Sequence, residues 1–491
     1  SSRKFNLRAR VNCWYLFHMM AMARQLRKPS TKMTPLPAKF ESTKYLTRPA
    51  SAKTGFQVEA RHRIPIIIIP PLKFHQQTFP TFLRSDQPKF LFFAQRKYPN
   101  QHFGLQEKGK EFRQFPYMQV SQKTIEEINS RPFSLSSRLA VVGLDGFVDK
   151  IVAPVEKRHG LGENFTPVST ISQMGEKISA AAGKSANVEL YPRFEKLGGN
   201  GPIMANALLS LGMKVRYLGA LGEPAVHGVF EEFARLTQAV SLCEPGITTA
   251  MEFKDGKVML GNTLSLERID FKRVIEACGE GEFIDMLSLA DLVSIVNWTM
   301  IPKMTALLIE LADKVLPNLP PRDTRSFFFD LADPAKRSST DINEVLRVIS
   351  RFQAHAEVTL GLNYNEGLQV CDVLGLKGGS KSEADLKSMA TEIRRKLGIS
   401  TIVLHPVESA ACATKDGVYW CEGPFCENPK ITTGAGDHFN AGFCSARLSG
   451  FSPLTSLALA TCTSGHYVRT AQSPSTSQVI ELLKANTQIN S

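Results

Sequence analysis

From about residue 137 to the C-terminus, short apolar runs alternate with stretches in which apolar residues recur every three or four positions. The runs have the length of buried strands, and the spacing between them predicts helices. The runs lie at 138–147, 214–222, 291–298, 326–333, 356–363 and 399–405, and the clearest helical spacing lies at 201–212 and 225–238. This alternation predicts an α/β fold in which helices flank a parallel sheet on both faces.

One segment departs from this rhythm. Residues 248–262 read "TTAMEFKDGKVMLGN" and alternate around Asp255-Gly256, a pair typical of a tight hairpin turn. We expect a small β-flap, or lid, with segments near 150–196 and 246–264. A flap of this kind is suited to close over a substrate and exclude water.

The stretch "AAGKSAN" at 181–187 resembles the end of a phosphate-binding P-loop. Ile178 stands where that loop requires its first glycine, so the spacing argues against the motif. We assign residues 155–190 to an insertion near the lid.

The sequence "KITTGAGDHFNAGF" at 430–443 combines a glycine-rich turn with helical spacing. The inward face of the predicted helix consists of Phe439, Gly442, Phe443 and Ala446. A helix start carries unpaired N–H groups and the positive end of the helix dipole, so it suits an anion such as a phosphate. Asp437 would repel that anion, and it makes chemical sense as a base that takes a proton from the group attacking the phosphate. A glycine-rich helix cap with an exposed aspartate is the alternative.

Several predicted strands are followed by a polar residue: Asp145, Asn297, Asp330 and Asn363. The carboxyl ends of parallel strands meet at one edge of the sheet, where ligands of such folds bind. In "GLDGFVD" at 143–149, the carboxylates of Asp145 and Asp149 are suited to bind vicinal hydroxyl groups. Asp145 is the stronger candidate because it follows the strand directly, and a solvated turn residue is the alternative for Asp149.

Gly198, Gly199 and Asn200 precede the helical stretch at 201–212. Glycines let a polar ligand approach the backbone, and an amide side chain both donates and accepts hydrogen bonds. We expect these three residues to bind substrate, with a plain turn and helix cap as the alternative.

In "LNYNEG" at 362–367, Asn363 and Glu366 are three residues apart. This pair suits a hydrated Mg²⁺, which keeps most of its waters and takes few protein ligands. A surface helix start is the alternative. Asp330, Asp333 and Arg337 form a further charged cluster for which we expect a supporting role in the same cleft.

The chain has 59 Lys and Arg against 46 Asp and Glu, a formal charge of +13. Residues 1–120 hold 22 of the basic and five of the acidic residues, which leaves 37 basic and 41 acidic residues in the remainder. The excess positive charge therefore belongs to the N-terminal quarter, and the remainder does not have the composition of a nucleic-acid binder.

Nine cysteines lack CxxC spacing and are odd in number. Free thiols in a reducing compartment fit this pattern better than disulfides or a metal site. No apolar stretch reaches the length of a membrane helix. We expect a cytoplasmic protein, or an organellar one where the basic leader is a genuine transit peptide.

Residues 1–117 show neither helical periodicity nor strand alternation. A disordered or non-native leader, an organelle transit peptide and a nucleic-acid-binding arm are the three explanations. We favour the first, because "MQVSQKTIEEINS" at 118–130 has the character of a natural start, and we expect one domain over 118–491.

The motifs above occur in the order found in the ribokinase/PfkB family of carbohydrate and nucleoside kinases, which the chain resembles over about 137–487. "TTGAGDHFNAGF" resembles the family's C-terminal signature, and "KLGGNGPIMANALLSLGMKVRYLGALGE" at 196–223 resembles its N-terminal signature. The resemblance implies a ribokinase-like fold and transfer of a phosphoryl group from ATP to a hydroxyl of a sugar or sugar-like molecule.

The resemblance assigns roles that agree with the residue types. It implies that Asp437 is the general base and that Gly434, Ala435 and Gly436 form the anion hole for the transferred phosphoryl group. ATP is then the co-substrate, and Mg²⁺ is organised near Asn363 and Glu366.

Two departures from the family pattern matter. Family members often carry an acid before the Thr-Thr-Gly-Ala-Gly-Asp motif, associated with a monovalent cation, and Ile431 stands there, which argues against potassium activation. Where many relatives have a glycine-bearing nucleotide loop, this chain reads "HPVESA" at 405–410, so its nucleotide preference is open. For His438, beside the expected base, a packed side chain is favoured over one that tunes the base.

We therefore expect a kinase for a sugar, with a small-molecule substrate, no membrane partner and a homodimer through the lid. A nucleoside kinase is the first alternative and would use an aromatic slot, for which Phe147, Tyr191 and Trp298 are available. A catalytically silent sugar or nucleotide sensor is the second, favoured by the altered loop at 405–410 and opposed by Asp437.

Overall fold

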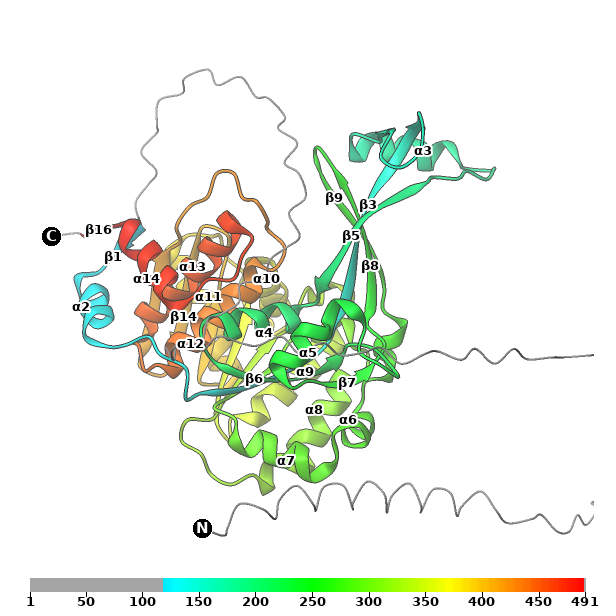
Figure 1. Ribbon diagram of the computed structural model, residues 1–491. Coiled ribbons are helices and arrows are strands. Elements are labelled where there is room, and N and C mark those ends of the chain that lie inside the picture. The colour runs from blue at the N-terminus through cyan, green and yellow to red at the C-terminus, as the bar shows by residue number, and fades with distance from the viewer. Residues whose placement is uncertain (1–117, 490–491) are drawn as a thin grey trace, which may run out of the picture. The chain divides into compact units, whose positions relative to one another are not determined.

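The computed structural model describes residues 118–489, and Figure 1 shows their arrangement. The interpretations of residues 1–117 lie outside the described residues. A short parallel pair, β1 (Met118–Val120) and β16 (Thr487–Ile489), brings the two ends of the described chain together.

A nine-stranded sheet forms the centre, in the order β15-β14-β13-β12-β11-β10-β2-β6-β7. The strands from β13 to β7 are parallel, and β14 and β15 add an antiparallel hairpin at one edge. Their bounds are β2 (Leu139–Leu144), β6 (Lys214–Ala220), β7 (Val240–Cys243), β10 (Leu292–Ile295), β11 (Ser326–Asp330), β12 (Glu357–Leu362), β13 (Thr401–Leu404), β14 (Ser409–Thr414) and β15 (Gly417–Glu422). The predicted parallel sheet is confirmed. Between β2 and β10 the order of the strands reverses direction, and ligands of open α/β sheets bind at such a point.

Helices cover both faces of this sheet, as the alternation predicted. One layer comprises α6 (Phe271–Cys278), α7 (Glu280–Leu289), α8 (Met304–Glu310), α9 (Ser339–Phe352), α10 (Tyr364–Val373) and α11 (Glu383–Leu397). The other comprises α2 (Gln122–Ser130), α4 (Asn200–Ser210), α5 (Glu231–Thr237), α12 (Ala435–Leu448), α13 (Pro453–Thr470) and α14 (Thr476–Ala485). In β11, Phe327 and Phe329 join the first core and Phe328 joins the second, because successive strand residues point to opposite faces.

The helix expected near residue 435 is α12, and it is buried on every side. Asp437 and the nine residues after it are all buried. The apolar face expected from the sequence is therefore only part of the helix surface that packs against the rest of the protein. Gly442 allows α13 to come close, since a Cβ there would lie 2.5 Å from Oγ1 of Thr463. The start of α12 is thereby fixed by the core.

A five-stranded small sheet stands apart from the body and carries α3 at its far end (Figure 1). It consists of β3 (Phe147–Arg158), β4 (Phe165–Pro167), β5 (Leu190–Gly198), β8 (Gly246–Phe253) and β9 (Gly256–Asn262), with α3 (Ile171–Ala180). The predicted hairpin is confirmed, with β8 and β9 antiparallel and Phe253 opposite Gly256. Residues 155–190, expected to be an insertion near the lid, lie in the small sheet and α3. A minor core of Val152, Val168, Met174 and Met251 holds this part together.

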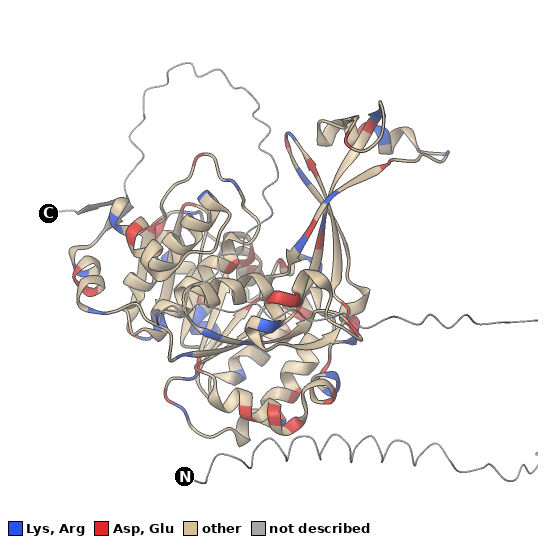
Figure 2. Ribbon diagram, viewed as in Figure 1, with Lys and Arg blue, Asp and Glu red and all other residues tan. Residues whose placement is uncertain are grey.

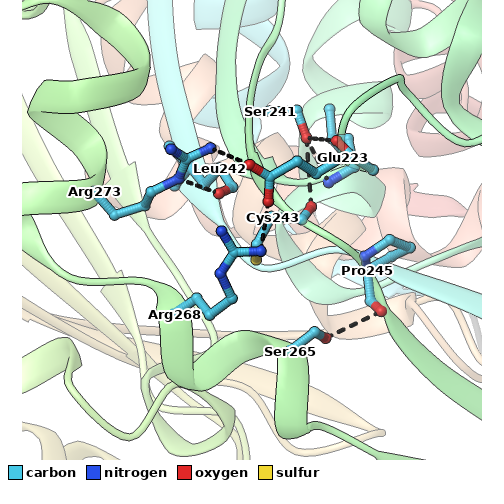
Figure 3. A network of polar contacts seen from close by, with 10 residues as sticks. Glu223, Ser241, Leu242, Cys243, Pro245, Ser265, Arg268 and Arg273 are labelled. Atoms are coloured by element: carbon cyan, nitrogen blue, oxygen red, sulfur yellow. Dashed lines mark hydrogen bonds and ion pairs between the residues drawn. The ribbon is translucent and has the colours of Figure 1, made fainter. Parts of the chain in front are cut away.

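The base of the β8–β9 hairpin is tied to the body by a polar network (Figure 3). Glu223, in the loop after β6, accepts from the guanidinium groups of both Arg268 and Arg273. Arg273 also donates to the carbonyl of Leu242 on β7. Ser265 donates to the carbonyl of Pro245 at 3.1 Å, which joins the segments that enter and leave the hairpin.

The helix predicted over 225–238 is shorter than expected. A 3₁₀ turn (Gly228–Phe230) precedes α5, because the carbonyl and the ring of His227 accept from Phe230 and Val229 and divert the start of the helix. Other short turns are Leu264–Arg268, Trp298–Met300, Leu311–Val315, Leu316–Asn318 and Pro334–Lys336. Among the described helices, none has the length and apolar character needed to cross a membrane.

Basic and acidic residues are interspersed over the body and the small sheet (Figure 2). This distribution agrees with the near balance of charge outside the N-terminal quarter. All eight cysteines of the described segment are free, and seven of them are buried.

Candidate active site

Polar side chains gather at the carboxyl edge of the central sheet, as expected from the sequence. Asp145 follows β2, Asn297 lies two residues beyond β10, Asp330 ends β11 and Asn363 follows β12. His405 occupies the same position after β13. The parallel strands therefore bring residues from five separate segments to one edge.

Asp437 lies in the first turn of α12 and is 5% exposed. The side chain of Asn200 donates to Oδ1 of Asp437 at 3.0 Å and orients the carboxylate. Burial raises the pKa of Asp437 to about 8, and the nearby carboxylates of Asp145 and Glu366 act in the same direction. The alternative of an exposed aspartate at a helix cap is therefore wrong.

The turn before α12 places glycine where its flexibility is needed. Gly434 is the N-cap with φ of 91°, a conformation that favours glycine. The amide of Ala435 donates to the carbonyl of Thr432 at 3.2 Å, so it is already engaged. Within residues 118–489 the amide of Gly436 has no such partner, and it is the donor best suited to receive an anion.

Asp145 is entirely buried and serves as the cap of α4. Its carboxylate accepts from the backbone amides of Asn200 at 2.9 Å and Gly201 at 2.8 Å, and from the side chain of Asn297 at 2.6 Å. Burial raises its pKa to about 6 despite these bonds. Because three donors already occupy this carboxylate, little of its capacity is left for a ligand.

Asp149 lies on β3 at the start of the small sheet, and the solvated turn expected as an alternative is wrong, since its side chain is 6% exposed. Its pKa is raised by burial, opposed by the positive charge of Lys196 and a hydrogen bond from Thr248. A Cβ at Gly198 would lie 2.5 Å from Oδ1 of Asp149, so a residue larger than glycine at this position would clash with the carboxylate. In the described contacts Asp149 has fewer donors than Asp145, which makes it the better candidate for binding hydroxyl groups.

The second glycine of the pair makes room for the other carboxylate. Gly199 has φ of 100°, and a Cβ there would lie 2.9 Å from Oδ2 of Asp145. The three residues predicted to bind substrate thus lie between two buried carboxylates. Asn200 links them to Asp437 through its side chain.

Asn363 and Glu366 form a capping box at the start of α10. Asn363 Oδ1 accepts from the amide of Glu366 at 3.0 Å, and Glu366 Oε2 accepts from the amide of Asn363 at 2.8 Å. Glu366 Oε1 also accepts from the amide of Asp333 at 2.8 Å. Glu366 is 4% exposed, so this is a helix start, although not the surface one given as the alternative.

Asp330 belongs to the same acidic group. The pKa of Asp330 is raised well above its usual value by burial and by the charges of Glu366 and Asp437, and Asn440 donates to it at 2.8 Å. Burial also raises the pKa of Glu366. A cation among these carboxylates would relieve their mutual repulsion.

A hydrated Mg²⁺ keeps most of its waters and takes few protein ligands. Within the described chain no three His, Cys, Asp or Glu side chains come close enough together to hold a metal ion. Glu366 and Asp330 are the residues that would hold Mg²⁺, largely through waters, whereas the side chain of Asn363 is engaged in the cap and positions Glu366.

His438 is a packed side chain, as favoured from the sequence. Its ring nitrogens contact the carbonyl of Gly434 at 2.7 Å and the hydroxyl of Ser473 at 2.8 Å, and burial lowers its pKa to about 4. The ring stacks on Tyr467 with centroids 3.6 Å apart, and Tyr467 donates to the carbonyl of Thr433 at 3.2 Å. Both side chains therefore fix the glycine-rich turn.

The aromatic residues considered for a nucleoside base are engaged elsewhere. Phe147 lies in the body core against Gly246. Trp298 is buried, donates to Thr305 at 2.8 Å and lies beneath the guanidinium group of Arg337, and Tyr191 packs on Phe165 in the small sheet. Phe147 and Trp298 are buried, whereas Tyr191 is partly exposed.

Sequence reasoning assigned no role to three residues of the site, which are Asn297, Asn440 and His405. Asn297 was recognised only as a polar residue at a strand end. Asn440 lies three residues after Asp437, so the helical spacing alone predicts that both side chains lie on the same side of the helix. Asp333 and Arg337 have supporting roles. The backbone amide of Asp333 donates to Glu366. Arg337 donates to the carbonyls of Trp298, Thr299 and Ile301 and supports the loop after β10.

Comparison with known proteins identifies relatives of this chain. The chain is 26% identical over 364 residues to the ketohexokinase of Haloferax volcanii, a match that covers 72% of this chain and 94% of that protein. A carbohydrate kinase from Agrobacterium tumefaciens has the same fold, with a TM-score of 0.50 and 16% identity over 71% of this chain and 97% of that one. Ribokinase of Thermotoga maritima is 18% identical, with a TM-score of 0.45, over 71% of this chain and 99% of its own.

The fold and the family model that the chain matches define a carbohydrate kinase of the ribokinase/PfkB class, a phosphotransferase. Residues 120–486 match the model of the family described as prokaryotic ketohexokinase. Since this match spans most of the chain, the chain belongs to that family. The alternative of a silent sensor is set aside.

Proposed function

We propose that this protein transfers the γ-phosphoryl group of ATP to a hydroxyl of a ketohexose, with Asp437 as the general base. The single observation that carries the proposal is the buried Asp437 at the glycine-rich start of α12, oriented by Asn200. The name of the Haloferax volcanii relative supports a ketohexose as the acceptor.

In the proposed reaction the sugar hydroxyl gives its proton to Asp437 while its oxygen attacks the γ-phosphorus. The bond between that phosphorus and the β,γ-bridging oxygen breaks, and ADP leaves. The amide of Gly436 and the positive end of α12 stabilise the charge on the transferred group. A pKa of Asp437 near 8 places the base close to working pH, which suits a proton acceptor.

The remaining residues position the substrates. Asp149 binds sugar hydroxyls, and Gly198, Gly199 and Asn200 shape the space beside it. Asp145 holds α4 and Asn297 in place. Glu366 and Asp330 would hold Mg²⁺, which would supply charge neutralisation for the phosphates.

The small sheet acts as a lid in this proposal. It carries Asp149 and begins beside Gly198, so movement of the sheet would carry a substrate-binding carboxylate with it. Residues 118–491 form the kinase domain, and the free cysteines fit a reducing cytoplasmic environment.

A substrate panel tests the proposal. Release of ADP is measured for the full chain with ketohexoses, aldohexoses, pentoses, polyols and nucleosides, with Mg²⁺ and ATP. We expect turnover that is fastest with a ketohexose. Turnover confined to nucleosides or aldoses would contradict the assignment of the acceptor, and turnover with none of the compounds would contradict the kinase assignment itself.

A further inference from the structure

Asn440 joins the helix of the proposed base to the acidic group at the edge of the central sheet. It lies on α12 three residues after Asp437, so both side chains project from the same side of the helix. Its side chain is 1% exposed, and its Nδ2 donates to Oδ2 of Asp330 at 2.8 Å. The charge of Asp437 also contributes to the raised pKa of Asp330, so these two carboxylates lie near each other. Asn440 therefore connects α12 with the end of β11 beside the base.

The amide of Asn440 is placed by its donor end alone. An ionised carboxylate only accepts hydrogen bonds, so the amide must present its nitrogen to Asp330. Its Oδ1 is buried and has no hydrogen-bond partner within residues 118–489. A Cβ at Gly361 would lie 3.1 Å from this oxygen, so the glycine in β12 leaves room for the amide. A buried oxygen without a partner costs stability, so the bond to Asp330 explains the side chain better than stability does.

The other oxygen of Asp330 is held by the loop that follows β11. The amide of Ala332 donates to Oδ1 of Asp330 at 2.8 Å, and the amide of Asp333 donates to Oε1 of Glu366 at 2.8 Å. Ala332 and Asp333 have φ of 56° and 59°, conformations that residues other than glycine rarely adopt. One tight loop thus holds one side of each carboxylate.

The second oxygens of the two carboxylates are held by different helices. Oε2 of Glu366 accepts from the amide of Asn363 at the start of its own helix, α10. Oδ2 of Asp330 accepts from Asn440 on α12, the helix that carries Asp437. Because one rigid helix carries both Asp437 and Asn440, the bond to Asp330 sets the place of that carboxylate relative to the base.

Resting on the kinase function proposed above, we propose that Asn440 is a positioning residue that holds the carboxylate of Asp330 in place relative to Asp437. Asn440 touches neither substrate and acts only through Asp330. The base acts on the attacking hydroxyl, and the carboxylates of Asp330 and Glu366 face the cation and the phosphates. Small displacements between such groups lower the rate strongly, so a fixed separation favours transfer.

Variants of the full chain test this role. Asn440→Leu keeps the approximate shape of the side chain without its donor, and it is made in wild type and in Asp330→Ala. Ser445→Ala is the matched control, since Ser445 is also buried on α12 and its Oγ has no partner within the described residues. The measurements are kcat, the KM for the sugar, the melting temperature, and the affinity for Mn²⁺ in the presence of ADP by electron paramagnetic resonance.

We expect Asn440→Leu to lower both kcat and the Mn²⁺ affinity about 10- to 100-fold, as is typical when the partner of a metal-facing side chain is lost. The KM for the sugar should not change. In the Asp330→Ala background the same substitution should lower neither quantity further, because the group that Asn440 positions is absent. Ser445→Ala should leave kcat and the Mn²⁺ affinity as in wild type.

Two results would overturn the role of Asn440. The first is a folded Asn440→Leu variant with the kcat and Mn²⁺ affinity of wild type, which would leave the amide a purely structural part. The second is an equal loss with and without the carboxylate of Asp330, which would mean that Asn440 acts by another route. Asn440→Ala, with a smaller side chain, decides between these results where the Leu variant does not fold.

The two proposals fail in different ways. Sugar turnover that persists in wild type while Asn440→Leu changes neither quantity leaves the kinase function standing and overturns the role of Asn440. A Mn²⁺ affinity that depends on Asn440 only where Asp330 is present, without turnover of any sugar, does the reverse. A wild-type protein that binds no Mn²⁺ with ADP and turns over no sugar overturns both.

Discussion

Asp145 and Asp149 are four residues apart, yet their carboxylates have different neighbours. Three donors occupy Asp145, whereas Thr248 and the charge of Lys196 are the main influences on Asp149. We expect Asp145→Asn to place an amide against backbone N–H groups and to lower the free energy of unfolding by about 1–3 kcal/mol. Asp149→Asn should instead raise the KM for the sugar about tenfold or more with little loss of stability.

Chemical denaturation and steady-state kinetics on the two variants separate these roles. The reverse result, in which Asp145→Asn changes only the sugar KM and Asp149→Asn only stability, would restore the ranking suggested by the sequence.

The pKa of Asp437 leads to a prediction on stability. Burial raises this pKa from 3.8 to about 8, so between these values the folded protein holds a proton that the unfolded chain has lost. The contribution of Asp437 to stability therefore decreases as pH rises through this window, by up to about 1.4 kcal/mol per pH unit. Asp437→Asn removes this effect, so the variant should gain stability relative to wild type between pH 5 and pH 8. Unfolding curves at several pH values measure the difference, and a constant difference would contradict the assigned pKa.

At the scale of elements, the network around Glu223 ties the β8–β9 hairpin to the body. The pairs with Arg268 and Arg273 are partly exposed, so Glu223→Gln should cost under about 1 kcal/mol of global stability. We expect instead faster hydrogen exchange over 246–262 and a sugar KM raised several-fold, because the base of the lid loosens. Hydrogen exchange read by mass spectrometry measures this.

Glu232→Gln is the matched control, since Glu232 also pairs with an arginine but only within its own helix. Exchange in the hairpin that responds equally to both substitutions, or to neither, would show that the network does not anchor the lid.

The sequence predicted the elements and the edge at which the polar residues meet, because strand length, periodicity and parallel order determine both. It did not predict which carboxylate caps α4, because the donors Asn200 and Gly201 are more than 50 residues from Asp145. The sequence also did not predict that α12 is buried on all sides. Its apolar periodicity indicates only one buried face, and another face is covered by α13. The capping role of Asn363 shows the limit of a motif: the same Asn-x-x-Glu spacing describes a helix start and a metal site.

At the scale of the whole molecule, the small sheet presents exposed apolar residues that the body does not cover. Phe194 on β5 is 52% exposed, and Met259 and Leu260 on β9 are about equally exposed. Both strands lie at edges of this sheet, and uncovered edges favour pairing with another copy. We therefore expect a homodimer through the lid.

Light scattering after gel filtration tests this expectation. Wild type should have twice the mass of the chain, and Phe194→Asp should be monomeric. Val418→Asp, an exposed apolar position on β15 of the body, is the control and should remain dimeric. A wild-type monomer at micromolar concentration would contradict the prediction.

The most direct test of Asp437 as the general base is the kcat of Asp437→Asn on the best sugar, at saturating sugar and ATP, beside wild type. The substitution removes the proposed base and leaves an amide of the same shape for Asn200 to contact. We expect kcat to fall by about 10²- to 10⁴-fold while the variant remains folded and binds both substrates. A folded variant that retains more than about a tenth of wild-type kcat would contradict Asp437 as the base, since such a base is worth at least 10²-fold.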